Sequence, residues 1–265
     1  GATTVSNQTA VGHLALQSLT TGEANTSVGY IALKLDTTGS YNAALGQNAL
    51  GSNTTASSNT GLGFSAGYGN TTGASNTFVG SSAGGSGTIH ATGSNNTFIG
   101  AASGGTATDT LNANALGSGV KSETGYTTVG IDGSDIRAAN GTATWATVSD
   151  RRVKKDIEDS TAGLSFINDL RPRTFKFKNK GDLPKEFTGS YEEGSTEAYK
   201  NSKTQHGFIA QEVKEAIDNH SDITDGFKMW DVRETGQQEV AEAALIPMLV
   251  KAIQELSAEV KKLKG

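Results

Sequence analysis

The segment Asn25-Thr26-Ser27-Val28-Gly29 recurs in modified form along the first half of the chain, for example as Asn76-Thr77-Phe78-Val79-Gly80. Its glycine returns at a fixed interval, because 46 minus 29 and 63 minus 46 both give 17 residues. The interval is 17 throughout, except for one step of 20 before the sixth member, in the series Gly12, Gly29, Gly46, Gly63, Gly80, Gly100 and Gly117. A period this regular indicates stacked coils that each contact only their neighbours.

Each repeat is expected to form one coil of a parallel β-roll, or β-solenoid. A unit of 17 residues suits about two strands of roughly five residues and two tight turns. The recurring Asn and Gly supply the positive φ angles that such turns require. We expect two positions to point inward, the Val, Leu or Ile before each glycine and the Ala three residues after it. The three additional residues around Thr88-Ile89-His90 should bulge from one coil.

Composition supports a solenoid and disfavours several other classes of protein. The chain has 265 residues, of which 35% are hydrophobic and 34 are glycine, with a net charge of −5. Disordered chains combine low hydrophobicity with high net charge, which is not the case here. We expect no nucleic-acid binding, because no basic stripe is present, and no membrane insertion, because no apolar run approaches ~20 residues. Without Cys, and with His13 and His90 lacking partners at ligand spacing, no metal or cofactor is predicted.

The repeats resemble the head repeats of trimeric adhesins, which form left-handed parallel β-rolls. The resemblance covers about residues 7–120 and rests on units such as Asn25-Thr26-Ser27-Val28-Gly29 with Ala32 three residues further on. It implies a trimeric shaft. Charged side chains are scarce between residues 1 and 120, where they are Glu23, Lys34, Asp36 and Asp109. The resulting hydroxyl- and amide-rich surface either binds a host glycan or receptor or is an inert wall, and both interpretations stay open.

Three domains are predicted: a repeat shaft at residues 1–120, a β stem at 121–148 and a charged domain at 149–265. The stem is still rich in Gly and Thr but lacks the 17-residue period. It has strand-like stretches at 127–131 and 142–148. In the third domain we expect a half-buried strand with Phe175 and Phe177, a loop at 181–204, and a strand that enters a helix over 205–217. This domain is therefore predicted to be a small α+β fold.

The C-terminus is predicted to be a coiled-coil helix. Its apolar residues are spaced 3-4-3-4-3, at Ile246, Leu249, Ile253, Leu256, Val260 and Leu263. β-branched residues at the first seam position with Leu at the second favour a parallel dimer. The seam is shorter than three heptads, so we expect the rest of the molecule to determine the number of copies. In the alternative, this seam packs on its own domain instead of on copies of itself.

Four segments in order resemble the intramolecular chaperone auto-processing domain of phage tailspikes and fibres, the domain carried by endosialidase-type spikes. They are Ser149-Asp150-Arg151-Arg152-Val153-Lys154-Lys155-Asp156-Ile157, Leu170-Arg171-Pro172-Arg173-Thr174-Phe175-Lys176-Phe177, 207–213 and 245–256. Val153 stands where Leu is more usual. The resemblance implies a homotrimeric chaperone that aligns three fibre chains and then releases itself, with the cut between Ser149 and Asp150.

The residues at this junction are chemically suited to such a cut. A Ser hydroxyl needs a base to act as a nucleophile, and a Lys whose pKa is lowered by burial can serve. The resemblance places the base at Lys154, with Lys155 as the second candidate. It gives Arg152 an orienting role or a carboxylate partner, and Asp150 a role in assisting the leaving amide. In the alternative reading, Ser149 or Asp150 only caps a helix that starts near residue 151.

The sequence therefore predicts a virion protein, a tail fibre or spike tip that is assembled in the host cytoplasm as a homotrimer. Its only enzymatic activity would be a single-turnover Ser-Lys self-cleavage, with no external substrate. The first alternative is a structural adhesin whose C-terminal part is a retained trimerisation anchor that never cuts. A carbohydrate-degrading spike is disfavoured, because residues 1–148 hold few carboxylates and a glycosidase needs a facing Asp/Glu pair.

Overall fold

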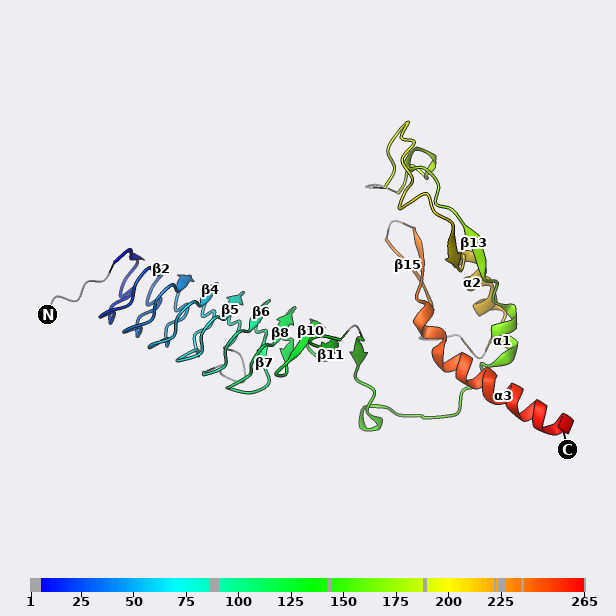
Figure 1. Ribbon diagram of the computed structural model, residues 1–265, viewed down its shortest axis with the longest axis horizontal. Helices are drawn as coiled ribbons and strands as arrows, with labels where there is room; N and C mark the ends of the chain where they lie inside the picture. Colours follow the sequence, from blue (N-terminus) through cyan, green and yellow to red (C-terminus); the bar gives the residue numbers. More distant parts are fainter. Residues whose placement is uncertain are drawn as a thin grey trace. The chain divides into compact units, whose positions relative to one another are not determined.

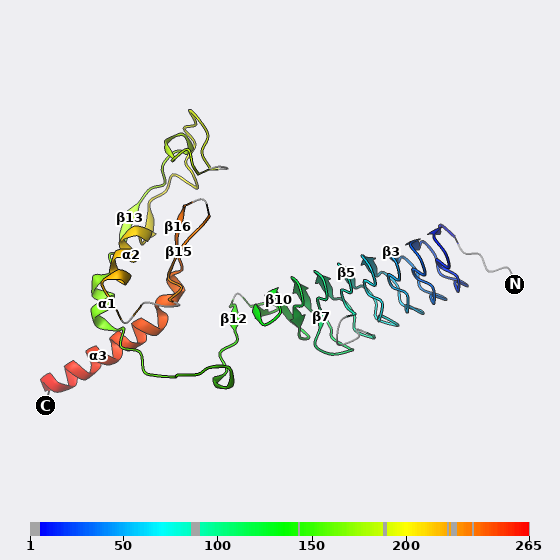
Figure 2. The same ribbon diagram turned by 180° about the vertical axis from the view of Figure 1, so that it is seen from behind.

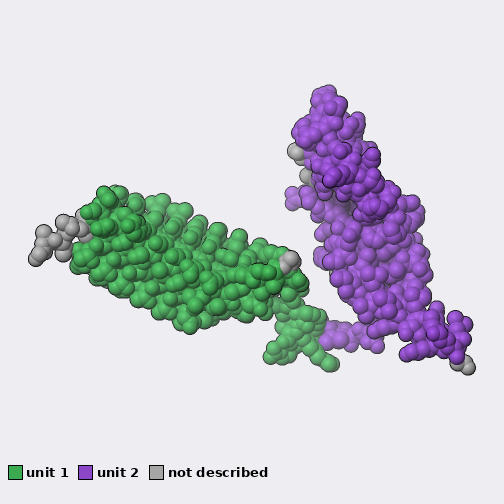
Figure 3. Space-filling model, viewed as in Figure 1, with its two compact units in different colours: residues 1–154 green, residues 155–265 purple. Residues whose placement is uncertain are grey.

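The computed structural model describes residues 6–85, 91–142, 144–187, 190–221, 223, 227–234 and 236–264. The chain divides into two compact units, residues 1–154 and residues 155–265 (Figure 3). The predicted site residues from Ser149 to Lys154 therefore all belong to the first unit.

The first unit is a β-solenoid, as predicted, and the second is a small α+β unit that ends in a long helix. Seven short strands of the solenoid stack in chain order and pair in parallel (Figure 1, blue to green; Figure 2). They are β1 (Thr9–Val11), β2 (Thr26–Val28), β3 (Ala43–Leu45), β4 (Thr60–Leu62), β5 (Thr77–Val79), β6 (Thr97–Ile99) and β8 (Asn114–Leu116).

Each coil contributes one three-residue strand to this stack, so the prediction of two longer strands per coil was wrong. Outside these strands, single backbone hydrogen bonds also join each coil to the next one. For example, the Leu33 N–H donates to the Ala49 carbonyl at 3.0 Å and the Thr37 N–H to the Thr54 carbonyl at 2.8 Å. Left-handed residues in the same coil, such as Ile31 with φ 52° and Leu33 with φ 46°, interrupt the extended conformation that a second strand would need. The predicted bulge at residues 88–90 lies outside the described residues.

The interior of the solenoid is filled by alanine, leucine and phenylalanine side chains, with Val120 at its end. The alanines three residues after the glycines are buried as predicted, at Ala32, Ala49, Ala66 and Ala83. The aliphatic residue before each glycine was also predicted to point inward, and this was wrong. Exposed fractions are 57%, 50%, 43% and 41% for Val11, Leu45, Leu62 and Ile99. Neighbouring residues of a strand point to opposite faces. The position two before the glycine takes the inward place, as at Phe78 and Phe98, so the aliphatic residue must face outward.

The recurring asparagines form a buried ladder and do not supply the positive φ angles that were predicted for them. The Asn42 N–H donates to Asn25 Oδ1 at 2.9 Å, and Asn42 Nδ2 donates to the Ala56 carbonyl at 2.8 Å. The same pattern repeats at Asn59. The left-handed residue is the one before each asparagine, for example Tyr41 with φ 60°. An Asn side chain offers both a donor and an acceptor, which satisfies polar backbone groups inside the coil stack.

The stem continues the same sheet beyond the repeats. Strand β10 (Tyr126–Ile131) pairs in parallel with β8 and in antiparallel with β11 (Ser134–Ala139), which pairs with β12 (Ala146–Thr147). The strand expected at 127–131 is present, and the one expected at 142–148 is reduced to β12 among the described residues. A small second sheet joins β7 (Gly104–Gly105) to β9 (Lys121–Ser122).

The described part of the second unit contains three α-helices, two antiparallel strand pairs and one apolar core. The core includes Phe166, Val213, Met229 and Leu245. Strand β13 pairs with β14, and β15 pairs with β16, both in antiparallel. In chain order the elements are α1 (Leu164–Asp169), β13 (Arg173–Phe175), η2 (Lys180–Asp182), β14 (Gln205–Gly207), α2 (Ala210–Asp218), β15 (Trp230–Val232), β16 (Gln238–Val240), η3 (Glu242–Leu245) and α3 (Ile246–Lys264).

Helix α3 presents different faces to its own unit and to solvent. Met248 packs against the core of the unit and Ala252 is buried. The seam predicted from the heptad spacing faces outward, and its members Ile253 and Leu263 are 64% and 87% exposed. Within one chain the seam therefore does not pack on its own domain. No helix among the described residues is long and apolar enough to cross a membrane.

Candidate functional site

Ser149 and Lys154 meet across a single turn of 3-10 helix. Ser149 follows β12, and η1 (Arg151–Val153) reverses the chain immediately after it. The turn is closed by the Lys154 N–H, which donates to the Arg151 carbonyl at 3.1 Å. It brings the Lys154 Nζ to 2.7 Å from the Ser149 Oγ. A five-residue separation thus becomes a direct hydrogen bond between the two side chains that the sequence assigned as base and nucleophile.

Asp150 and Arg152 form a second pair on the same turn. Asp150 caps η1, because its Oδ1 accepts from the Arg152 N–H at 2.8 Å. The Arg152 guanidinium adds three charge-assisted bonds: Nε donates to Oδ1 at 3.0 Å and to Oδ2 at 3.1 Å, and Nη2 donates to Oδ2 at 2.5 Å. The hydrogen bond from the Arg152 side chain is the main reason that the pKa of the Asp150 carboxyl is lowered. Asp150 is therefore an ionised carboxylate at neutral pH. Because Asp150 and not Ser149 caps η1, the Ser149 hydroxyl can contact Lys154.

Of the two candidate lysines, Lys154 is the one that contacts the serine. The Lys155 side chain is exposed and its nearest described ion-pair partner is Asp156, at 3.9 Å. Arg152 forms an ion pair with Asp150, and the role of Arg152 in the site stays a prediction.

The site is open to solvent in the single chain. Ser149 and every residue from Arg151 to Ser160 are exposed. Burial is what makes a lysine a good base, because it disfavours the charged ammonium. A single copy of the chain thus supplies the contact between the two groups without the desolvation that general-base catalysis requires.

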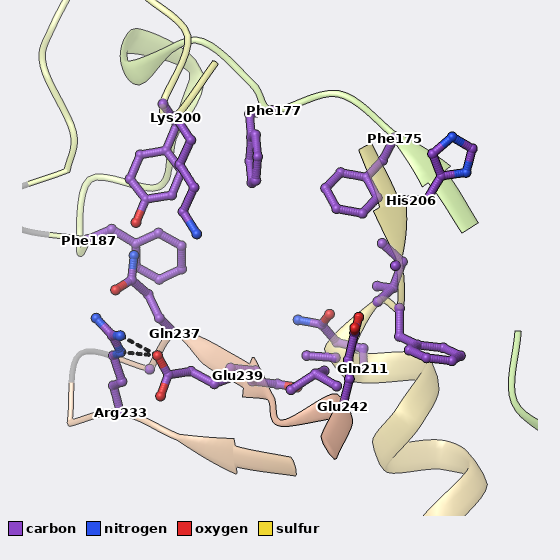
Figure 4. Close-up of a pocket in the computed structure, with 18 residues that line it drawn as sticks. Phe175, Phe177, Phe187, Lys200, His206, Gln211, Arg233, Gln237, Glu239 and Glu242 are labelled. Atoms are coloured by element: carbon purple, nitrogen blue, oxygen red, sulfur yellow. Dashed lines mark hydrogen bonds and ion pairs between the residues drawn. The ribbon is translucent and has the colours of Figure 1, made fainter. Parts of the chain in front are cut away.

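The second unit contains a separate cavity of about 590 Å³ that the sequence did not indicate. Its walls include Phe175, Phe177 and Phe187, and the ion pair between Arg233 and Glu239 lies at one edge (Figure 4). Phe187 comes from the segment that was expected to be only a loop. The predicted site residues do not line this cavity. Among the described residues, no group of three His, Asp or Glu side chains is placed to hold a metal ion.

Residues 149–222 match the family described as chaperone of endosialidase, Peptidase S74. Residues 149–222 are therefore a chaperone-of-endosialidase domain. The match to the endosialidase chaperone starts at Ser149, so the Ser149–Lys154 contact lies at the first turn of the domain. It ends before the β15–β16 hairpin and α3. Neither the curated proteins nor the solved structures include a match to this chain.

Proposed function

We propose that this protein is a phage-type tail fibre or spike tip that folds with the help of its own C-terminal domain. In this proposal residues 149–265 form a trimerising intramolecular chaperone, which releases itself by cutting the Ser149–Asp150 bond. The observation that carries the proposal is the 2.7 Å contact between Lys154 Nζ and Ser149 Oγ at the first turn of the matched endosialidase chaperone domain. The product would be a virion component, assembled in the host cytoplasm.

The proposed reaction needs only groups on this turn. Neutral Lys154 takes the proton from the Ser149 hydroxyl, and Oγ forms a bond to the carbonyl carbon of its own residue, in the Ser149–Asp150 peptide, which closes a strained four-membered lactone ester. The bond from that carbon to the Asp150 nitrogen breaks, and the nitrogen leaves with the proton from Lys154. Water then hydrolyses the ester and restores the hydroxyl. Each chain cuts once, so no external substrate is involved.

Assembly would supply the desolvation that the single chain lacks. Lys154 is exposed in one copy, and its ammonium must lose a proton before it can act as a base. In this proposal the assembled trimer buries the side chains near the junction that are exposed in one copy. The cut would then follow assembly, which is the order that a folding helper requires.

A repetitive shaft gives a physical reason for a folding helper. Successive coils are nearly identical in sequence. Three chains can therefore align one whole repeat out of register and lose few contacts. Structures built from non-local strand pairs also fold slowly. A C-terminal trimer fixes the register first, and removal of the helper leaves the shaft kinetically trapped.

One observation favours the alternative of a retained anchor that does not cut. In the single chain the contact is a lysine donating to a serine, with both side chains exposed. Such an arrangement also occurs on surfaces that have no catalytic role.

The chaperone role is tested by comparing the full chain with a chain that stops at Val148. We expect the full chain to give a soluble shaft of three copies and the shortened chain to aggregate or remain monomeric. The measurement is the mass in solution by light scattering. A shortened chain that assembles into the same soluble trimer with the same yield would reject the chaperone role.

A further inference from the structure

The outer face of the solenoid carries one aliphatic residue per coil in an unbroken column. Strand register places each of these residues directly beside the next, from β1 to β10. We call the column the aliphatic ladder, and its eight members are Val11, Val28, Leu45, Leu62, Val79, Ile99, Leu116 and Val129. Four of them are at least 40% exposed and the others are partly buried.

The second outward-facing column of the same strands is also uncharged. It consists of Thr9, Thr26, Ala43, Thr60, Thr77, Thr97, Asn114 and Thr127. A sheet face that meets water normally carries charged side chains, which keep it soluble and protect it from association. The two columns together form a neutral strip with an aliphatic line along it, the kind of surface that marks an interaction site.

The geometry of the ladder points to another copy of this chain as its partner. Neighbouring strands are about 4.8 Å apart, so eight rungs extend over roughly 34 Å with a constant step. A second solenoid of the same sequence has the same step, and its side chains can interdigitate along the whole length. The strip offers no charge to an acidic or basic partner. The exposed seam of α3 is an independent surface of the same kind in the second unit.

We propose that the shafts of this protein meet through the aliphatic ladder, with three ladders converging on a common axis. This inference rests on the trimer of the proposed function and adds the surface that joins its shafts. All rungs precede Ser149 in the chain, so the interface would stay with the shaft after the proposed cut. The α3 seam would bring the copies together, and the ladder would hold them once the chaperone has gone.

The chain has no cysteine, so a single introduced thiol reports the approach of two copies. Disulfides form when the Cβ atoms come within about 4.5 Å, which neighbouring ladders on one axis permit. In the full chain, Leu62→Cys should give disulfide-linked dimers under mild oxidation, read on a non-reducing denaturing gel. The matched control is Thr55→Cys, at an exposed position outside the strands, and should remain uncrosslinked.

A third variant, Ile253→Cys, reports on the α3 seam and separates the two proposals. Crosslinks at both Leu62→Cys and Ile253→Cys, without crosslinks at Thr55→Cys, support the ladder. A crosslink at Ile253→Cys alone overturns the ladder and leaves the trimer standing, in which case the strip faces a different partner or solvent. Absence of crosslinks at both positions overturns the trimer and the ladder together. A Thr55→Cys variant that crosslinks as fast as Leu62→Cys also overturns the ladder.

Discussion

Glu255 caps helix α1 from helix α3: its Oε2 accepts a hydrogen bond from the Leu164 backbone N–H at 2.7 Å. Gly163 leaves room for this carboxylate, since a Cβ there would lie 2.4 Å from it. Glu255 follows Met248 and Ala252 along the inward side of the helix. The exposed seam lies on a neighbouring side of the same helix. Helix α3 can therefore hold its own unit together and bind other copies at the same time.

Replacing Glu255 with Ala should destabilise the second unit by about 1 kcal/mol, the usual cost of losing a side-chain cap at a helix N-terminus. The measurement is the midpoint of urea unfolding, followed by a probe of the second unit such as Trp230 fluorescence. The control Glu259→Ala removes an exposed carboxylate one turn further along α3. Equal midpoints for the two variants would show that the Leu164 contact contributes nothing.

A charge on the α3 seam should prevent both assembly and cleavage. Leu256→Glu places a carboxylate in a seam that would be buried between copies, and an unpaired buried charge is strongly unfavourable. We expect monomers by sedimentation and no fragments on a denaturing gel. Ser257→Glu adds the same charge beside the seam and should assemble and cut normally. Monomers of Leu256→Glu that still cut would show that one copy suffices.

Asp36 should make the shaft less stable at neutral pH than in mild acid. Asp36 is fully buried in a column with Asn53 and Asn70, and its pKa is raised to about 6, chiefly by burial. The folded state therefore holds the Asp36 proton more tightly than the unfolded state, in which the pKa of this carboxyl is 3.8. The resulting loss of stability starts as the pH rises above the unfolded value and is complete above about 6. It amounts to about 2–3 kcal/mol.

Asp36→Asn tests this directly, because an amide is already used at the equivalent positions. An Asn at this site can accept from the Gly39 N–H, as the carboxylate does at 2.8 Å. The variant should unfold at a higher urea concentration than the parent at pH 7 and at a similar one at pH 4. Asp109→Asn, at an exposed position, should change neither midpoint. A parent whose stability is the same at both pH values would refute the account of Asp36.

The sequence predicted the solenoid because a strict period leaves few other folds, and it predicted Ala32 and its equivalents inside because coils must approach closely. It misassigned Leu62 and its equivalents, since a period gives the spacing of residues but not which strand face is inward. Bulky residues at the inward position, such as Phe78, could have indicated the correct face. The motif paired Ser149 with Lys154, and the two side chains are hydrogen-bonded, while their roles in a cut stay a prediction. The cavity at Phe187 depends on a loop without periodic signal.

The measurement that tests the central claim most directly is denaturing mass spectrometry of the freshly purified full chain beside three variants. The parent should split into one piece that ends at Ser149 and one that begins at Asp150. Ser149→Ala lacks the nucleophile, and Lys154→Arg replaces the base with a side chain that stays protonated, so both should remain whole. Lys155→Arg should cut like the parent. A parent that stays whole, or a Lys154→Arg variant that cuts at the parental rate, would contradict self-cleavage by this Ser-Lys pair.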